Sequence, residues 1–263
     1  MVNLNSTPTP KAPDSASFVE APVPILSPWS NSGEPQSAYS SQRQQMVHQQ
    51  LMGRGITDAR VLDAMLRVPR HRFVPPSEVQ CAYWDQPLPT SHGQTISQPY
   101  IVAFMTNIAA IPAQGRVLEV GTGSGYQAAI LAELAATVYS VEIIDSLAQQ
   151  AQKTLEQLGY QNIHIKQGNG YEGWPEHAPY DAILVTAAPT RVPSALVDQL
   201  AMGGKLVVPV GYSSQTILVI TRHLTGVSTE YTIPVRFVPM IGEGRGAEAA
   251  PPAGMNPPSG RPE

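Results

Sequence analysis

Short apolar runs alternate with longer amphipathic segments between residues 116 and 211, which is the pattern of repeated βα units. The apolar runs predict strands, and the segments whose apolar positions recur every three to four residues predict helices. The expected strands are 116–120, 137–142, 162–166, 180–186 and 205–210, and the expected helices are 125–135, 145–158 and 193–201. Two later runs rich in β-branched residues, 216–221 and 230–238, predict antiparallel strands.

This order of elements predicts an α/β fold with an open, mostly parallel, doubly wound sheet that ends in an antiparallel strand. The run 180–186 is almost continuously apolar, as expected for a strand that is covered on both faces, so we expect helices on both sides of the sheet. Ligands of such sheets bind at the carboxyl ends of the strands, where the chain order reverses. Residues 121–125, Glu142, 168–170 and 186–189 fall at such ends.

Two helices are predicted ahead of the sheet, and we interpret them as a small helical cap. Apolar positions at helical spacing occur within 46–52 and 61–66, and glycines end the first of these helices. Asp58 is the expected N-cap of the second helix. Neither helix contains residues whose pattern indicates chemistry.

Ser97 precedes a third helical pattern, which runs to residue 109. Ser97 is a candidate N-cap, and Pro99 would lie in the first turn of this helix. On these residues alone, helix capping is a sufficient explanation for Ser97.

The two ends of the chain differ in composition from its middle. Residues 1–41 form a Pro- and Ser-rich leader and residues 242–263 a tail rich in Gly, Ala and Pro, and we expect both to be disordered. The remaining residues, 42–241, form the predicted domain. Within it, 42–112 holds the helical cap and the loop before the third helix, and 113–241 holds the ligand-binding sheet.

Composition excludes some classes of partner. The chain has 263 residues and a net charge of −4, which gives no reason to expect binding to nucleic acid or to an anionic membrane. No apolar run reaches the roughly 18 residues that a membrane-spanning helix needs. Cys81 is the one cysteine, and the first residues lack a signal-peptide pattern, so we expect a cytoplasmic protein. We expect a monomer and no metal site.

Three glycines at every second position, Gly121, Gly123 and Gly125, join the first strand of the repeat to its helix. Glycine tolerates φ > 0 and lets a ligand approach the backbone closely. A dinucleotide site would show the spacing G-x-G-x-x-G, whereas here Tyr126 follows the third glycine. The tighter spacing suits a ligand without a pyrophosphate. The alternative is that these glycines form an ordinary βα turn that binds no ligand.

Polar residues at the strand ends narrow the range of possible ligands. Glu142 lies about twenty residues beyond the glycine loop, where a carboxylate accepts hydrogen bonds from ribose hydroxyls. Glu119 could hold a ligand ammonium directly or through water. Asn169 is placed to accept from the amino group of an adenine, and the Gly170 N–H to serve the neighbouring ring nitrogen. Ribose, adenine and ammonium recognition without a phosphate site indicates S-adenosylmethionine.

With these residues assembled, the chain resembles the protein-L-isoaspartate O-methyltransferases from about residue 45 to about residue 241. The glycine loop is shared with many methyltransferases, whereas the loop Gly93-Gln94-Thr95-Ile96-Ser97-Gln98-Pro99 is far more specific to this family. The other matching stretches are Val68-Pro69-Arg70, Arg72-Phe73-Val74, 117–126, 178–183, 203–206, 208–211 and 235–239.

The resemblance implies a Rossmann-like methyltransferase fold, S-adenosylmethionine as methyl donor, S-adenosylhomocysteine as product, and isoaspartyl-containing proteins and peptides as substrates. It implies that Ser97 is the active-site serine and that Thr95, Ile96 and Val238 contact the substrate. We expect the methyl donor to contact Thr95, Glu119, Gly121, Thr122, Gly123, Gly125, Glu142, Ile143, Asn169 and Gly170.

The chain departs from the family pattern at Asn169, where the family usually has Asp. Asn keeps an acceptor for adenine but loses the charge, and charged acceptors make stronger hydrogen bonds, so we expect weaker affinity for the methyl donor. Two alternatives stay open: a methyltransferase that acts on a small molecule or RNA, and a non-catalytic relative that only binds the methyl donor.

Overall fold

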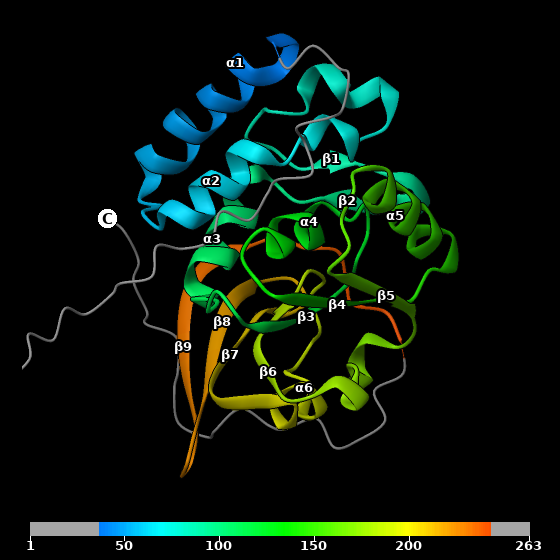
Figure 1. The fold of residues 1–263 in the computed structure, drawn as a ribbon. Helices are drawn as coiled ribbons and strands as arrows, with labels where there is room; N and C mark the ends of the chain where they lie inside the picture. Colours follow the sequence, from blue (N-terminus) through cyan, green and yellow to red (C-terminus); the bar gives the residue numbers. More distant parts are fainter. Residues whose placement is uncertain (1–36, 243–263) are drawn as a thin grey trace, which may run out of the picture.

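A seven-stranded β-sheet forms the centre of the computed structural model, which describes residues 37–242 (Figure 1). Its strand order is β5-β4-β3-β6-β7-β8-β9. The strands are β3 (Arg116–Val120), β4 (Thr137–Glu142), β5 (Ile163–Gln167), β6 (Tyr180–Val185), β7 (Leu200–Val210), β8 (Gln215–His223) and β9 (Gly226–Val235). β5 to β7 are parallel, and β7, β8 and β9 are antiparallel. The predicted mostly parallel, doubly wound sheet is confirmed, and its chain order reverses between β3 and β6.

The main differences from the predicted boundaries lie after β6. β7 begins at Leu200 instead of residue 205, because it pairs with Tyr180 before a register shift in the ladder. The preceding helix therefore ends at Asp198 instead of residue 201. β9 begins at Gly226 instead of residue 230 because it forms a hairpin with β8, and its first residues are exposed at the sheet edge. An exposed edge strand lacks the apolar pattern on which the prediction relied.

Helices cover both faces of the sheet, as predicted. α3 (Pro99–Ala109), α4 (Tyr126–Ala132) and α5 (Asp145–Gln157) lie on one face, and α6 (Ser194–Asp198) lies on the other (Figure 1). Successive strand residues alternate between two apolar clusters. Val117, Ala182 and Val207 belong to the cluster under α3 and α4. Leu118, Ile183 and Val208 belong to the cluster that includes Leu196 of α6. This two-sided burial explains the nearly continuous apolar runs.

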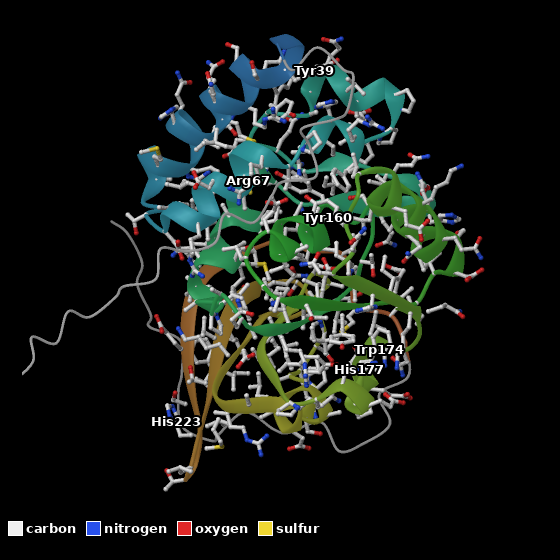
Figure 2. All side chains as sticks on the ribbon, viewed as in Figure 1. Tyr39, Arg67, Tyr160, Trp174, His177 and His223 are labelled. Atoms are coloured by element: carbon white, nitrogen blue, oxygen red, sulfur yellow. The ribbon has the colours of Figure 1, made fainter. Side chains whose placement is uncertain are left out.

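Aromatic rings complete the cover of the face that carries α6. The Tyr139 ring on β4 stacks on His177, with 4.1 Å between ring centroids, and meets the edge of Trp174 at 5.4 Å. Trp174 and His177 come from the connection between β5 and β6, beside the end of the sheet that holds β5 (Figure 2).

The helical cap begins earlier than the sequence predicted. α1 (Ser37–Gln45) continues directly into a π-helical turn, Met46–Leu51, so residues 37–41 of the expected leader are helical. The polar sequence of α1 hid this helix, which the Tyr39 ring anchors by stacking on His71 at 4.2 Å. Residues 1–36 and 243–263, for which we expect disorder, lie outside the described residues. Asp58 is confirmed as the N-cap of α2 (Ala59–Arg67), since its side chain accepts from the Arg60 N–H.

A buried carboxylate joins the cap to the sheet domain. Glu133, at the end of α4, accepts from Arg67 Nε at 2.7 Å and from the Tyr160 hydroxyl at 3.0 Å (Figure 2). Burial and the neighbouring Glu133 carboxylate raise the pKa of the Tyr160 hydroxyl, which therefore stays protonated and donates. Within residues 37–242 no helix combines the length and apolar character that crossing a membrane requires.

Candidate active site

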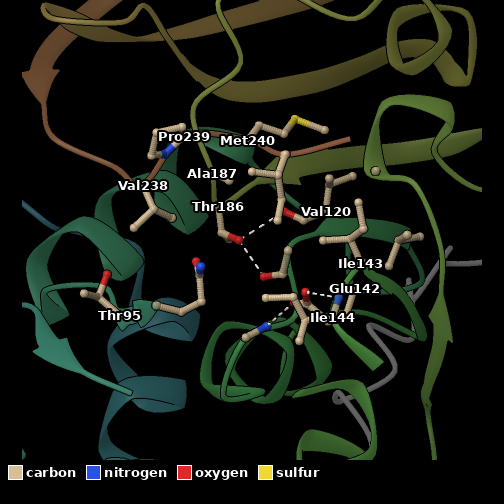
Figure 3. Close-up of a pocket in the computed structure, with 16 residues that line it drawn as sticks. Thr95, Val120, Glu142, Ile143, Ile144, Thr186, Ala187, Val238, Pro239 and Met240 are labelled. Carbon is tan, nitrogen blue, oxygen red and sulfur yellow. Dashed lines mark hydrogen bonds between the residues drawn. The ribbon is translucent and has the colours of Figure 1, made fainter. Parts of the chain in front are cut away.

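A cleft of about 590 Å³ opens at the carboxyl ends of β3, β4 and β6, where the strand order reverses (Figure 3). This is where ligands bind in open α/β sheets. The cleft is lined by Gln94, Thr95, Val120, Gly121, Gly123, Val141, Glu142, Ile143, Ile144, Gly170, Thr186, Ala187, Val238, Pro239, Met240 and Ile241.

The glycine loop forms the floor of the cleft, and its conformation requires glycine. Gly121, Gly123 and Gly125 have φ angles of +97°, +53° and +87°, a region that residues with a Cβ rarely adopt. A Cβ on Gly121 would also collide with the Thr186 hydroxyl. That hydroxyl lies 2.5 Å from the Gly121 carbonyl oxygen and 3.0 Å from that of Val120, and it donates to them. Thr186 therefore fixes the start of the loop from β6.

Glu142 fixes the middle of the same loop from the end of β4. Its Oε2 accepts from the Gly123 N–H at 2.8 Å, and its Oε1 accepts from the Ile144 N–H at 3.0 Å (Figure 3). A carboxylate offers about four lone-pair sites, so each oxygen keeps capacity for one more donor. Glu142 can therefore hold the loop and accept from two ligand hydroxyls at once.

Glu119 lies beneath the loop instead of in the cleft. Its side chain is 0% exposed and it does not line the cleft. Ser140 Oγ donates to Glu119 Oε2 at 2.5 Å and lies 2.5 Å from Thr122 Oγ1, which makes a chain of hydroxyls from the carboxyl to the loop. Among the described residues, Glu119 Oε1 has no hydrogen-bond partner. An orphan buried oxygen of this kind is a candidate partner for a bound ligand or water.

Burial raises the pKa of the Glu119 carboxyl to about 8. The hydrogen bond from Ser140 lowers this pKa, and the nearby Glu142 charge raises it. Glu119 is therefore mostly protonated at neutral pH, and a cation brought near it would favour the ionised form.

Asn169 and Gly170 lie at the β5 side of the cleft. Gly170 lines the cleft, and a Cβ there would collide with a methyl group of Val120. Asn169 is not a lining residue. Its side-chain oxygen accepts from the Tyr171 N–H at 3.1 Å and lies beside Gly242. In this conformation Asn169 caps the short 3₁₀ turn Gly170–Glu172.

A second pocket of about 330 Å³ is lined by Ser97 and by residues of the glycine loop. Thr95, Gly121, Gly123 and Thr186 line both pockets, so the two spaces share a wall. The other lining residues of the second pocket are Ile96, Ser97, Val102, Thr122, Ser124, Tyr126 and Gln127.

The prediction that Ser97 is a helix N-cap is wrong. α3 begins at Pro99, and its N-cap is Gln98, whose side chain makes no capping hydrogen bond. The Tyr100 N–H instead donates to Asp85 Oδ1 at 3.2 Å. Among the described residues the Ser97 hydroxyl makes no hydrogen bond, so it is available to a ligand in the second pocket.

Residues 238–240 form one wall of the cleft after the chain has left β9. The Ala188 N–H donates to the Val238 carbonyl, and the Met240 N–H donates to the Ala188 carbonyl, both at 2.8 Å. These bonds tie the wall to the connection that follows β6. The strand predicted to reach residue 238 ends at Val235, because the following residues pair with Ala188 instead.

The structure thus brings most of the predicted site residues to the two pockets. Thr95, Gly121, Gly123, Glu142, Ile143, Gly170 and Val238 line the cleft, and Ile96, Ser97 and Thr122 line the second pocket. Glu119, Gly125 and Asn169 line neither. Sequence reasoning did not name Ser140 or Thr186 as site residues, although it placed 186–189 at a strand end. Within residues 37–242 no group of three or more His, Cys, Asp or Glu side chains could hold a metal ion.

Comparison with known proteins identifies the family. Residues 41–245 match the family model of protein-L-isoaspartate(D-aspartate) O-methyltransferase. The chain is 59% identical over 211 residues to a protein-L-isoaspartate O-methyltransferase of Synechococcus sp. (strain JA-2-3B'a(2-13)), covering 77% of this chain and 86% of the relative. It is 56% identical over 200 residues to that of Gloeobacter violaceus (strain ATCC 29082 / PCC 7421), covering 75% and 98%.

Solved structures agree with the sequence matches. A Plasmodium falciparum structure described as a protein-L-isoaspartate O-methyltransferase in complex with S-adenosyl-L-homocysteine superposes with a TM-score of 0.66. It is 28% identical in sequence, and the match covers 77% of this chain and 98% of that one. The chain belongs to the protein-L-isoaspartate(D-aspartate) O-methyltransferase family.

Proposed function

We propose that this protein transfers a methyl group from S-adenosylmethionine to the α-carboxylate of L-isoaspartyl residues in damaged proteins and peptides. The observation that carries the proposal is the shared wall between the cleft and the Ser97 pocket. A methyl donor bound in the cleft and a methyl acceptor bound beside Ser97 would meet at Thr95 and the glycine loop.

The residues of the cleft fit S-adenosylmethionine. Glu142 keeps acceptor capacity for the two ribose hydroxyls while it holds Gly123 and Ile144. Gly170 lines the cleft, and a Cβ there would collide with Val120. Glu119 has an orphan oxygen, but its carboxyl is buried, so we assign it to the ligand's ammonium through an intervening water or hydroxyl. Bound S-adenosylmethionine supplies a methyl group that its sulfonium charge has already activated.

Ser97 is the proposed catalytic residue, and its role is to orient the acceptor. The nucleophile is the substrate's own α-carboxylate, which is ionised at neutral pH because the pKa of such a group is near about 3.5. No general base is therefore required. The Ser97 hydroxyl donates to the carboxylate and holds one oxygen toward the shared wall. Positioning of this kind supplies at most roughly 7–11 kcal/mol of the barrier.

Substrate recognition is expected to rest on peptide backbone, since isoaspartyl residues arise in many sequence contexts. Thr95 and Ile96 form β2 (Thr95–Ile96), which pairs with β1 (Leu88–Pro89) beside the second pocket. Val238, on the wall formed by residues 238–240, lines the cleft together with Thr95 (Figure 3). An extended peptide along these residues would offer main-chain hydrogen bonds and few side-chain contacts, which gives broad specificity.

The product explains the repair. The methyl ester has a better leaving group than the free carboxylate, so it cyclises unaided to a succinimide, and hydrolysis of the succinimide returns part of the material to normal aspartate. We also propose that the enzyme is a cytoplasmic monomer and that it acts without nucleic acid. The net charge of −4 supports the last of these points. Light scattering of the purified protein and cell fractionation test these points.

One assay tests the proposed function. An isoaspartyl peptide and its normal aspartyl twin are offered with labelled S-adenosylmethionine, and base-labile methyl ester is counted. We expect label on the isoaspartyl peptide alone. Label on neither peptide, with normal binding of S-adenosylhomocysteine, would contradict the proposal. A screen of other acceptors would then separate a different methyltransferase from a non-catalytic relative.

A further inference from the structure

Asp85 connects the helical cap to the loop that carries Ser97. It lies in the irregular segment just before β1, and 23% of its side chain is exposed. Its Oδ2 accepts from Arg54 Nη1 at 2.6 Å and from Gln98 Nε2 at 2.7 Å. Its Oδ1 accepts from the Tyr100 N–H, and its carbonyl oxygen accepts a further bond from Gln98 Nε2 at 3.0 Å.

By accepting from the Tyr100 N–H, Asp85 caps the start of α3, although it is distant from this helix in the sequence. The first N–H groups of an α-helix lack partners within the helix, and a side-chain oxygen normally satisfies one of them. Pro99 has no N–H, and the side chain of the N-cap residue Gln98 makes no capping hydrogen bond. Asp85, fifteen positions earlier in the chain, accepts from Tyr100 instead. Ser97 is thereby spared from capping.

Arg54 holds the Asp85 carboxylate in place. The Arg54 guanidinium pairs with Asp85 and lies over the Tyr100 ring, 3.4 Å from the ring centroid. Asp85, Arg54 and Tyr100 therefore form a closed group of contacts just after Ser97. Hydrogen bonds to a carboxylate are shorter and stronger than hydrogen bonds between neutral groups. These contacts therefore hold the turn after Ser97 firmly.

The glycine loop does not depend on this group. Glu142 and Thr186 hold the loop from β4 and β6, and Asp85 lines neither pocket. Loss of Asp85 would release the turn after Ser97 while the methyl-donor cleft keeps its own supports. A change at Asp85 should therefore affect methyl transfer more than binding of the donor.

We infer that Asp85 is a positioning residue for methyl transfer: it holds residues 98–100, and through them the Ser97 hydroxyl, against the wall shared with the methyl-donor cleft. This inference rests on the proposed function of Ser97. Asp85 acts through Ser97 and touches no reacting atom.

The test compares Asp85→Ala and Asp85→Asn with Asp63→Asn. Asp63 is an exposed carboxylate of the same cap that also faces an arginine, Arg67, at 4.0 Å, so it is a matched control. A misplacement of about 1 Å far from the chemistry can cost about 100-fold in rate, and we expect a fall of that order in kcat for Asp85→Ala. Asp85→Asn, which keeps the shape and one acceptor oxygen, should be intermediate, and Asp63→Asn should match the unsubstituted enzyme.

Two further readouts separate positioning from general damage. The dissociation constant of S-adenosylhomocysteine, measured by calorimetry, should stay within about threefold of the value of the unsubstituted enzyme for both Asp85 variants. In binding free energy a threefold change is less than half of a tenfold change. Hydrogen exchange of the Tyr100 amide should be faster in Asp85→Ala, because its acceptor is lost. If Asp85→Ala does not fold, the same measurements on Asp85→Asn decide the matter.

Two results would overturn the inference: a kcat for the Asp85 variants equal to that of the unsubstituted enzyme, or a fall in kcat matched by an equal loss of S-adenosylhomocysteine affinity. Failure of the proposed function is distinguishable from both, since the unsubstituted enzyme and Asp63→Asn would then leave the isoaspartyl peptide unmethylated.

Discussion

The glycine loop and the loop that carries Ser97 meet in one wall, yet they are held by different parts of the molecule. Residues at the ends of neighbouring strands hold the glycine loop: Glu142 from β4 and Thr186 from β6. The helical cap holds the Ser97 loop, through β1 and Asp85. On the proposed function, the sheet therefore builds the methyl-donor site, and the cap builds the acceptor site.

Because different elements hold the two loops, binding of the methyl donor and transfer of the methyl group can be altered separately. The donor side relies on backbone geometry that glycine alone supplies, with a few carboxylate and hydroxyl contacts. The loop of Ser97 relies on two charged side chains from distant segments, Asp85 and Arg54, and on the amide of its own Gln98. Substitutions on one side should change the affinity for the methyl donor, and substitutions on the other should change the rate of transfer.

The largest expected effect is on the donor side, at Glu142. Glu142→Ala removes the acceptor for two backbone N–H groups and, on the proposed function, for the ribose hydroxyls. Hydrogen bonds to charged groups contribute about 1.5–3 kcal/mol each, so we expect S-adenosylhomocysteine affinity to fall by about 100-fold or more. Calorimetric titration measures this loss. Glu142→Gln, which keeps one acceptor oxygen, should lose less, and an unchanged affinity in Glu142→Ala would remove Glu142 from the donor site.

A smaller effect, on stability, is expected from Glu119 beneath the glycine loop. Its folded-state pKa is about 8, raised chiefly by burial from a usual value of 4.5. The folded protein therefore binds more protons than the unfolded chain between these values, and its stability falls as pH rises through this window. Below the window the contribution of Glu119 is fully present, and above it the contribution is lost.

Glu119→Gln tests this pH dependence, because Gln has the same shape and does not titrate. We expect the melting temperature of the unsubstituted protein to fall between about pH 5 and about pH 9 more steeply than that of Glu119→Gln. Differential scanning calorimetry at several pH values measures the two slopes. Equal slopes would show that the pKa of the Glu119 carboxyl does not differ between the folded and the unfolded protein.

The smallest expected effect is at Asn169, the neighbour of the cleft-lining residue Gly170. Asn169→Asp restores the charge that the family usually carries there, and a charged acceptor makes a stronger hydrogen bond to an adenine amino group. We expect S-adenosylhomocysteine affinity to rise by a few-fold, about 0.5–1 kcal/mol. If the affinity is unchanged, the charge at this position does not serve adenine. In the structure the Asn169 oxygen caps the Tyr171 N–H, so the melting temperature is a necessary control.

The sheet and the donor site could be predicted because their signals are local. Each strand of the repeat is an apolar run, the glycine loop is contiguous, and Glu142 follows its strand directly. The limits of β3 and β4 were predicted to the residue. β9 was misplaced because its first half is exposed at the sheet edge, where no apolar alternation marks a strand.

The supports of the acceptor site could not be predicted because they are distant in sequence. Asp85 lies in an irregular stretch with no periodicity, and nothing near it indicates that it caps α3. The sequence marks Asp85 only as a single carboxylate next to two aromatic residues, Tyr83 and Trp84. The burial of Glu119 also depends on the packing of α4 over β3, so its place on the strand could be predicted but its removal from the cleft could not.

The most direct test of the account is the kcat of Ser97→Ala on an isoaspartyl peptide at saturating S-adenosylmethionine. We expect a folded enzyme that binds S-adenosylhomocysteine normally and whose kcat falls about 10- to 100-fold, the effect of losing one hydrogen bond to a charged group. An unchanged kcat, or a covalent adduct on Ser97 in the unsubstituted enzyme, would contradict it.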